Sequence, residues 1–329
     1  MKNSTPRIAV VGAGYWGKNL IRNYAELGSL CAICDSNGKA LKSFADAYPG
    51  VQGVTSFQEL VRSKDIDAVA IAAPAEMHFS LAREALLSGK DVFVEKPLAL
   101  SLSDAHELKD IADKHDRILM VGHLLQYHSA FIKLKELIRK GELGRIHYIY
   151  SNRLSFGKIR REEDILWSFA PHDISMILSL AQEEPETVMA TGGNYLHKKI
   201  ADVTTTHLEF SSGLKAHVFV SWLHPFKEQT LVVVGERNMA VFRDTVPWSE
   251  KLLLYPHNIS WHNGFPVPDK KEAVQVEVEQ SEPLKAECSH FIECITSRKA
   301  PVTHAQEGIN VLRILKASQD SLLSNGRKI

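Results

Sequence analysis

A short apolar run that ends in a glycine-rich turn constrains the fold of this chain more than any other feature. Residues 7–11 are Arg-Ile-Ala-Val-Val, residues 12–17 are Gly-Ala-Gly-Tyr-Trp-Gly, and a helical pattern follows. G-x-G-x-x-G between a strand and a helix is typical of a dinucleotide site. Gly12 permits the tight turn, Gly14 lets the backbone approach a pyrophosphate, and Gly17 allows close helix packing. The pattern therefore predicts a helix N-terminus that binds phosphates.

An acidic residue lies at the distance from this turn that such sites require. The second apolar run, residues 30–34, is followed directly by Asp35, and the acidic residue is expected about 20 residues after the glycines. Its carboxylate would accept a hydrogen bond from the 2′-hydroxyl of the NAD ribose and would repel the 2′-phosphate of NADP. We therefore expect NAD as the cofactor. The alternative is that Asp35 only caps the following helix.

Strands and helices continue to alternate as far as Gly122. The expected helices cover residues 39–48, 57–61, 79–87 and 103–115, and the expected strands cover residues 53–55, 67–73, 91–94 and 118–122. Strands separated by helices at this spacing predict a doubly wound parallel sheet, and right-handed crossovers favour the Rossmann strand order. Residues 1–122 are thus predicted to form an α/β dinucleotide-binding domain.

Beyond Gly122 the pattern changes to alternating strands with few helices. The expected helices cover residues 130–140 and 170–180, a polar loop spans 155–164, and the expected strands cover residues 145–150, 187–191, 204–210, 215–222, 230–234 and 239–242. This predicts an α+β domain over residues 123–329 with an open, mainly antiparallel sheet that serves substrate binding and oligomerisation. Closing helices are expected within residues 284–323, and they either stay in this domain or pack back toward the first.

The charge balance and the cysteines limit the possible partners. Lys plus Arg and Asp plus Glu number 39 each, so no net field draws the chain to nucleic acid or to an anionic membrane. No apolar run approaches the roughly 18 residues of a membrane span. Cys31 and Cys34 lie on opposite faces of one expected strand, which argues against a metal site and fits free thiols in a reducing cytoplasm. We expect a cytoplasmic protein that binds small molecules and other copies of itself.

Residues 92–98 are Val-Phe-Val-Glu-Lys-Pro-Leu, an apolar run that stops at a charged pair and a proline, which is typical of the end of a buried strand. The run predicts Lys96 at the carboxyl edge of the sheet, where open α/β sheets bind ligands. A partly desolvated lysine there can donate a hydrogen bond to a developing alkoxide, and Glu95 can hold it in position. The alternative is a salt-bridged pair before a turn at Pro97.

Other residues are expected near the cofactor at the same edge. The strand that ends at Ala73 and Pro74 is followed by His78, which either touches the nicotinamide ribose or has no chemical role. Tyr15 and Trp16 either pack on the cofactor or fill the gap between helix and sheet. The predicted cofactor contacts also include residues 73, 74 and 95–97.

Three motifs together resemble one enzyme family. Residues 12–19, 95–97 and 166–174 are similar to the glucose–fructose oxidoreductase/inositol dehydrogenase (Gfo/Idh/MocA) family, and the resemblance covers nearly the whole chain. It implies a Rossmann domain, an open-sheet C-terminal domain, a catalytic lysine at Lys96 and a catalytic histidine at His172. Within the family, the resemblance is greatest to the branch that oxidises the 3-hydroxyl of UDP-N-acetylglucosaminuronic acid for bacterial surface polysaccharides.

His172 follows a proline at the predicted start of helix 170–180. Oxidation of a secondary alcohol needs a group that takes its proton, and histidine, with an ordinary pKa near 6.5, suits that role at neutral pH. The alternative is a structural histidine. Where the family commonly has an aspartate, this chain has Ser168. Asp164, Asp173 or a carboxylate of the substrate could then orient the ring instead.

The remaining substrate candidates are a set of cations and one tyrosine. Lys158, Arg160 and Arg161 precede the histidine helix and either bind a carboxylate or pyrophosphate or form a solvated loop. Tyr127 completes the predicted substrate contacts with Lys96, Ser168 and His172. The predicted protein is an NAD-dependent nucleotide-sugar dehydrogenase that forms a homodimer or homotetramer. The alternatives are a dehydrogenase or ketoreductase of another sugar or inositol, and a non-catalytic dinucleotide-binding regulator.

Overall fold

The computed structural model describes residues 5–161 and 163–329, so residues 1–4 of the first predicted domain and position 162 of the predicted polar loop lie outside the described residues. The chain forms two compact units. Unit 1 contains the chain as far as Tyr127 together with Glu282–Leu312, and unit 2 contains His128–Ser281 together with Arg313–Ile329. The sequence pattern predicts the division after Gly122 and leaves open whether the closing helices of residues 284–323 pack back toward the first domain. Residues 282–312 do belong to unit 1.

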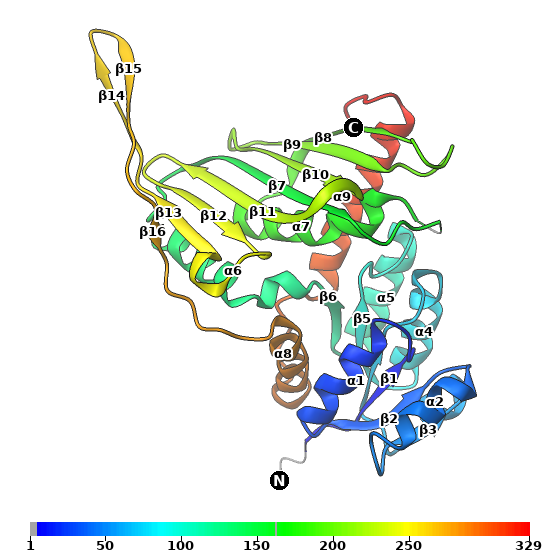
Figure 1. Ribbon diagram of the computed structural model, residues 1–329. Helices are drawn as coiled ribbons and strands as arrows, with labels where there is room; N and C mark the ends of the chain where they lie inside the picture. The colour runs from blue at the N-terminus through cyan, green and yellow to red at the C-terminus, as the bar shows by residue number, and fades with distance from the viewer. Residues whose placement is uncertain (1–4, 162) are drawn as a thin grey trace. The chain divides into compact units, whose positions relative to one another are not determined.

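Unit 1 contains a six-stranded, fully parallel sheet in the order β3-β2-β1-β4-β5-β6. Figure 1 labels these strands, except β4. Its strands are β1 (Ile8–Val11), β2 (Leu30–Cys34), β3 (Gln52–Val54), β4 (Ala68–Ile71), β5 (Asp91–Glu95) and β6 (Leu119–Gly122). This order confirms the predicted doubly wound Rossmann sheet. The order reverses between β1 and β4, and ligands of such sheets bind outside the carboxyl ends of the strands at that point.

The helices of unit 1 alternate with these strands. They are α1 (Gly17–Glu26), α2 (Gly38–Ala45), α3 (Phe57–Arg62), α4 (Ala75–Leu87), α5 (Leu102–Lys114), the short 3₁₀ helix η1 (Leu124–Tyr127) and the closing helix α8 (Pro283–Ser297). The helix expected over 79–87 begins earlier, at Ala75, because Pro74 can precede a helix but cannot continue one.

One face of the parallel sheet is covered jointly by α1 and α8. Leu20, Ile21 and Tyr24 of α1 share a single buried cluster with Phe291 of α8 and with Phe93 of β5. The rings of Phe93 and Phe291 lie 5.9 Å apart. The apolar residues of α8 recur at helical spacing, which creates the face that packs on the sheet. The closing helix therefore belongs to the core of unit 1.

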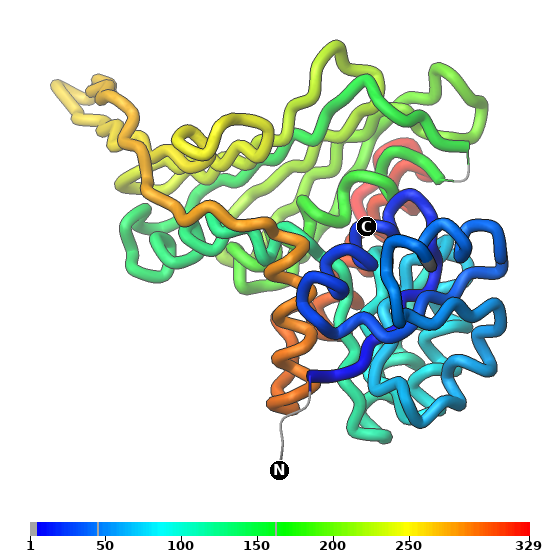
Figure 2. The backbone as a smooth tube through the Cα atoms, turned by 60° about the horizontal axis from the view of Figure 1, so that its bottom comes forward, coloured from blue at the N-terminus to red at the C-terminus, as the bar shows by residue number. Residues whose placement is uncertain are grey.

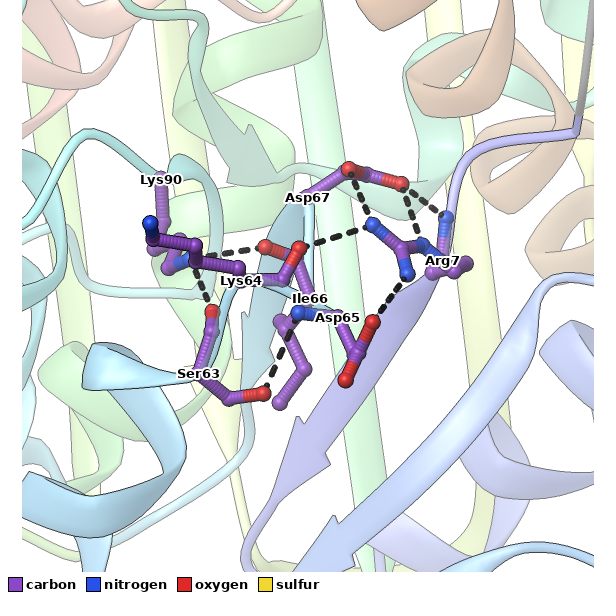
Figure 3. A network of polar contacts seen from close by, with 7 residues as sticks. All are labelled: Arg7, Ser63, Lys64, Asp65, Ile66, Asp67 and Lys90. Carbon is purple, nitrogen blue, oxygen red and sulfur yellow. Dashed lines mark hydrogen bonds and ion pairs between the residues drawn. The ribbon is translucent and has the colours of Figure 1, made fainter.

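Charged residues link the strands at the amino edge of this sheet, as Figure 3 shows. The Arg7 guanidinium donates to both oxygens of Asp67, at 3.2 Å each, and to Asp65 at 2.9 Å. The Lys90 ammonium donates to the carbonyls of Ser63 and Ile66, at 2.6 and 2.7 Å. The network joins the segments that enter β1, β4 and β5.

Unit 2 is built on an eight-stranded sheet in the order β16-β13-β12-β11-β7-β10-β9-β8. Its strands are β7 (Ile146–Phe156), β8 (Pro185–Gly193), β9 (Val203–Phe210), β10 (Lys215–Ser221), β11 (Leu223–Gly235), β12 (Met239–Arg243), β13 (Leu252–Tyr255) and β16 (Val274–Gln275). Only the β7–β10 pair among them is parallel. The sheet is mainly antiparallel, as predicted, and the turn at 211–213 joins β9 to β10.

Helices pack on this sheet from one side in Figure 1. Helix α6 (Ser129–Arg139) lies against β12 and β13, and α7 (Ile165–Ala181) lies against β7, β9 and β10. The last helix, α9 (Ala305–Leu323), begins in unit 1 and ends in unit 2. Within residues 5–161 and 163–329, we find no helix that has both the length and the apolar character needed to cross a membrane.

Helix α7 begins five residues before its predicted start at position 170. The Asp164 carboxylate accepts from the Trp167 N–H at 3.0 Å and caps the helix. Pro171 lies inside the helix instead of opening it, so the expectation that His172 lies at the helix start is wrong. Proline favours the first turn, but an Asp cap and the buried residues after it determine the start here.

The segment between β12 and α8 contains structure that the sequence pattern did not indicate. Besides β13 and β16, it forms a separate two-stranded sheet of β14 (Asn258–His262) and β15 (Phe265–Asp269). Figure 2 shows this hairpin extending beyond the strands of unit 2. Trp261 and Phe265 on it are 69% and 72% exposed. Short strands interrupted by prolines and histidines carry too weak a periodic signal to be recognised.

Candidate active site

The glycine turn lies at the carboxyl edge of the parallel sheet, between β1 and α1. Gly12 has φ +95°, and a Cβ there would lie 2.8 Å from the Ala72 carbonyl oxygen. A Cβ on Gly17 would lie 1.8 Å from the Gly12 carbonyl oxygen, whereas a Cβ on Gly14 would meet no atom within 4 Å. Two glycines thus permit close packing, and the third leaves its backbone open to a ligand. This arrangement fits the pyrophosphate of a dinucleotide.

The carboxylate of Asp35 is hydrogen-bonded to the backbone of this turn. One carboxylate oxygen accepts from the Ala13 N–H at 2.7 Å, and the other accepts from the Asn37 N–H at 2.8 Å. The cap of α2 is Asn37, whose side chain accepts from the Lys39 N–H. The alternative role of Asp35 as the helix cap is therefore wrong. Its half-buried carboxylate remains beside the turn, where a ribose hydroxyl can reach it.

Glu95 and Lys96 follow one another at the end of β5. Glu95 is buried, and its carboxylate accepts from the indole N–H of Trp16. Burial raises the pKa of Glu95 to about 7, although the Trp16 hydrogen bond and the Lys96 charge act in the opposite direction. A Cβ on Gly122 would lie 2.9 Å from the same carboxylate. Glu95 is thus held from two sides directly beside the half-buried Lys96.

The aromatic residues of the turn have different surroundings. Tyr15 is 80% exposed, whereas Trp16 uses its indole N–H to position Glu95. His78, in the first turn of α4, is buried and has both ring nitrogens near carbonyls, Pro97 O at 2.7 Å and Ala73 O at 2.9 Å. Burial lowers the pKa of His78, while its contacts with the Pro97 and Ala73 carbonyls act in the opposite direction, and the ring links the loop after β4 to the loop after Lys96. Its nitrogens are engaged by the protein.

A buried carboxyl group behind this edge was missed by sequence reasoning. Glu287 of α8 is fully buried, and among the described residues neither of its oxygens meets a hydrogen-bond donor. Burial, together with the charges of Glu95 and Glu307, raises the pKa of Glu287 well above its usual range. Nearby, His123 bonds Glu307 at 2.6 Å. A glutamate on the apolar face of a helix was the signal that could have found it.

Unit 2 contains a cavity of about 500 Å³ at one end of its sheet. It is lined by residues of β7 and the loop after it, of α7 and of β11, namely Arg153, Ser155, Phe156, Gly157, Arg160, Ser168, Phe169, His172, Pro225, Phe226, Lys227 and Gln229. Ser168 and His172 both contribute, because residues four apart in a helix lie on one face. The cavity brings together three of the predicted substrate residues, Arg160, Ser168 and His172.

The acidic candidates for orienting His172 have other partners. Asp173 is buried and accepts from Ser151 and, at 2.6 Å, from the Arg153 Nε. Asp164 caps α7 through its carboxylate. Both carboxylates therefore serve structural contacts in unit 2.

Four predicted substrate residues do not line the cavity. Lys96 directly follows β5 in unit 1. Lys158 and Arg161 are exposed outside its lining. Tyr127 lies in the core of unit 1, where its hydroxyl and that of Thr303 are 3.0 Å apart. In their place the cavity includes Arg153 and Lys227, from strands about 70 residues apart in sequence. No local motif marks such a pair, since only the sheet brings β7 and β11 together.

A parallel sheet whose carboxyl edge carries a glycine turn after β1, an acidic residue after β2 and a lysine after β5 is typical of a dinucleotide-dependent oxidoreductase. Comparison with protein families agrees with this class. Residues 6–123 match the oxidoreductase family with an NAD-binding Rossmann fold, and residues 131–241 match the GFO/IDH/MocA C-terminal domain. The chain therefore belongs to the Gfo/Idh/MocA family of NAD-binding oxidoreductases.

The individual proteins compared next share 30% or less of their aligned residues with this chain. An uncharacterized oxidoreductase of Streptococcus pneumoniae is 30% identical over 70% of this chain and 66% of its own length. A UDP-N-acetylglucosamine 3-dehydrogenase of Acidithiobacillus ferrooxidans is 27% identical over 65% of this chain and 66% of its own length. A solved structure described by the same enzyme name, from the same organism, has a TM-score of 0.85 at 23% identity and covers 97% of this chain and 98% of that one. At that identity the last comparison supports the fold alone.

Proposed function

We propose that the protein is an NAD-dependent nucleotide-sugar dehydrogenase that oxidises the 3-hydroxyl of UDP-N-acetylglucosaminuronic acid in bacterial surface polysaccharide synthesis. The observation that carries the proposal is the half-buried Lys96 at the carboxyl edge of the sheet, beside a glutamate held in place by Trp16. The relative that is named as a UDP-N-acetylglucosamine 3-dehydrogenase supports the nucleotide sugar and the position of oxidation. The cations of the unit 2 cavity support an anionic substrate.

NAD would be held by the turn at 12–17, by Asp35 and by the loops at 73–74 and 95–97, and when bound it supplies the acceptor for a hydride. Lys96 donates a hydrogen bond to the substrate oxygen and stabilises the negative charge that develops there. Glu95 keeps the ammonium of Lys96 in place. His172 takes the hydroxyl proton as general base.

The test is turnover with purified protein. We expect NADH to form when NAD and UDP-N-acetylglucosaminuronic acid are both present, with a higher kcat/KM for NAD than for NADP because of the Asp35 charge. UDP-N-acetylglucosamine, inositol and free hexoses serve as competing substrates. Faster oxidation of one of these would replace the proposed substrate. NAD binding without turnover of any of them would favour the regulator.

The role of His172 has its own test. We expect His172→Ala to lower kcat by roughly 10²–10⁴-fold, the usual contribution of a general base. Ser168→Asp should add a carboxylate on the same face of α7 and move the acidic limb of the pH–rate profile to higher pH, because a neighbouring negative charge raises the pKa of an imidazole. An unchanged profile and full activity in His172→Ala would make the histidine structural.

We also propose that the protein is a cytoplasmic homodimer or homotetramer. The face of the unit 2 sheet that is opposite α7 carries half-exposed aromatic rings, including those of Tyr148, Tyr150 and Phe219. The hairpin of β14 and β15 adds exposed apolar side chains, and an isolated two-stranded hairpin is marginally stable in water. Light scattering after size-exclusion chromatography measures the subunit number, and a monomer at all concentrations would contradict the proposal.

A further inference from the structure

Two phenyl rings at the mouth of the unit 2 cavity are unusually exposed. Phe156 is 72% exposed and Phe226 is 60% exposed, and both line the cavity. In contrast, Ser168 at the α7 side of the same cavity is only 5% exposed. The cavity therefore has a polar inner end beside His172 and an aromatic outer end. Single exposed apolar residues are common on proteins, but two rings beside one cavity suggest a planar ligand.

The backbone holds the outer end in a defined shape. Phe156 ends β7 opposite Leu223, the first residue of β11, and the pairing of the two strands is interrupted between Leu223 and Glu228. Phe226 and Lys227 lie in this bulge. The His224 ring contacts the Phe226 ring edge-on, with centroids 4.5 Å apart, and its Nδ1 is 2.9 Å from the Phe226 carbonyl oxygen. Bulges commonly redirect side chains toward a binding site.

The charges around the outer end favour an anion. Lys227 and Arg160 both line the cavity, and the described lining residues include no carboxylate. Arg160 bonds Glu163 at 2.9 Å, while among the described residues no carboxylate lies within 4.0 Å of the Lys227 ammonium. The third cation, Arg153, is already neutralised by the buried Asp173. Lys227 is therefore the cation with the most capacity for a ligand.

We propose that the outer end of this cavity binds a nucleoside diphosphate, with the base stacked on Phe226 and the phosphate oxygens bound by Lys227 and Arg160. Phe156 forms the second apolar wall. Aromatic rings stack on bases, and arginine and lysine bind phosphate oxygens with charge-assisted hydrogen bonds. The sugar would then occupy the inner end beside Ser168 and His172. The assignment deepens the proposed function, since it rests on that function for the sugar, but the nucleotide contacts can be measured separately.

The experiment is a titration of UDP into the protein saturated with NAD, which fills the dinucleotide site of unit 1 beforehand. We expect UDP to bind and uridine to bind more weakly. Phe226→Ala should weaken UDP binding by roughly five- to a hundredfold, the range typical of base stacking, whereas Phe226→Tyr should retain it. Lys227→Met should weaken binding of UDP more than binding of uridine.

Two matched variants control for general effects. Phe265→Ala removes a ring that is also 72% exposed but lies on the hairpin, and Lys158→Met removes an exposed cation outside the cavity lining. Both should leave UDP binding unchanged. Wild-type protein that does not bind UDP, or Phe226→Ala and Lys227→Met proteins with normal UDP affinity, would overturn the proposal.

Steady-state kinetics with a UDP-sugar can show which of the two proposals fails, the nucleotide subsite or the dehydrogenase activity. For an active nucleotide-sugar dehydrogenase, Phe226→Ala should raise KM and leave kcat nearly unchanged, because the base contact is equal in the ground state and the transition state. If a UDP-sugar is oxidised and Phe226→Ala has a normal KM, only the nucleotide assignment fails. If UDP binds as predicted and no UDP-sugar is oxidised, the nucleotide assignment holds and only the dehydrogenase proposal fails.

Discussion

The two ends of strand β5 carry lysines in opposite situations. Lys90, before the strand, is 8% exposed and donates to two carbonyls of the 63–66 segment. Lys96, after the strand, is half-buried beside the positioned Glu95. The same contrast holds for the whole parallel sheet. Charged groups at the amino edge, such as Arg7 and Asp67, neutralise each other and join loops, whereas those at the carboxyl edge are held in place beside a turn that is open to a ligand.

Strand direction explains this difference. In a parallel sheet all strands end at the same edge, and each following helix begins there with unpaired N–H groups. That edge therefore offers hydrogen-bond donors that the protein itself does not use. At the other edge the helices end, and charged side chains such as Asp91, which bonds Arg298 at 2.6 Å, link the segments that enter the strands. A charge at the amino edge stabilises the fold, and a charge at the carboxyl edge is available for chemistry.

The largest effect predicted for the comparison of the two sheet edges is a difference between Lys96 and Lys90. Lys96→Ala should lower kcat by roughly 10²–10³-fold, the loss expected for one donor to a developing oxyanion, with little change in NAD affinity or unfolding free energy. Lys90→Ala, the matched variant, should instead lower the unfolding free energy by about 1–3 kcal/mol, because two carbonyls lose their donor, and leave kcat unchanged. Kinetics and chemical denaturation of both proteins measure this. A Lys96→Ala enzyme with normal turnover would remove the contrast.

The glycine turn gives a second contrast, within the carboxyl edge itself. Gly17→Ala should lower the unfolding free energy by about 1–3 kcal/mol, as overpacking does, since its Cβ would lie 1.8 Å from a carbonyl oxygen. Gly14→Ala should leave stability unchanged, because its Cβ meets nothing, and should weaken NAD binding. Thermal melting with and without NAD distinguishes the two. Equal stability losses would mean that Gly14 also serves packing.

A smaller effect is expected from the Trp16 contact with Glu95. The hydrogen bond from the indole lowers the pKa of Glu95, which burial raises to about 7. Trp16→Phe should therefore raise this pKa further. Because the ionised carboxylate orients Lys96, the acidic limb of the kcat profile should move to higher pH. His172, as the general base, also produces an acidic limb in the pH profile of kcat. The profile of Trp16→Phe is therefore compared with that of His172→Ala, which identifies the limb that belongs to His172. A limb that does not move in Trp16→Phe would separate Glu95 from catalysis.

The smallest effect is predicted at the amino edge. Asp67→Ala breaks the ion pair with Arg7. The side chain of Asp67 is 41% exposed and that of Arg7 is 44% exposed. Exposed ion pairs contribute little to stability because water and salt screen them, so only a slight loss of unfolding free energy is expected, with kcat and NAD affinity unchanged. Chemical denaturation at low and high salt provides the measurement. A loss of activity in this variant would show that the amino edge also influences the site.

The local sequence was enough to predict the residues that lie at the carboxyl edge of the parallel sheet. The glycine turn, Asp35 and Lys96 each lie directly after a strand, and strands buried on both faces are recognisable as continuous apolar runs. Because parallel strands share one carboxyl edge, their positions in sequence were enough to predict that these residues gather there. The resemblance to the Gfo/Idh/MocA family, carried by short motifs at residues 12–19, 95–97 and 166–174, was likewise visible without a structure and is supported by the family comparison.

Only the tertiary structure decided which residues surround the cavity of unit 2. Arg153 and Lys227 come from strands that pair across a bulge, and no local pattern connects them. The start of α7 depended on the Asp164 cap, so the interior position of His172 was not predictable from Pro171. Tyr127 was expected at the substrate and instead packs in unit 1, where Glu287 of the closing helix is also buried. Local motifs specify which strand ends bear functional groups, but contacts between distant segments depend on packing, which sequence periodicity does not encode.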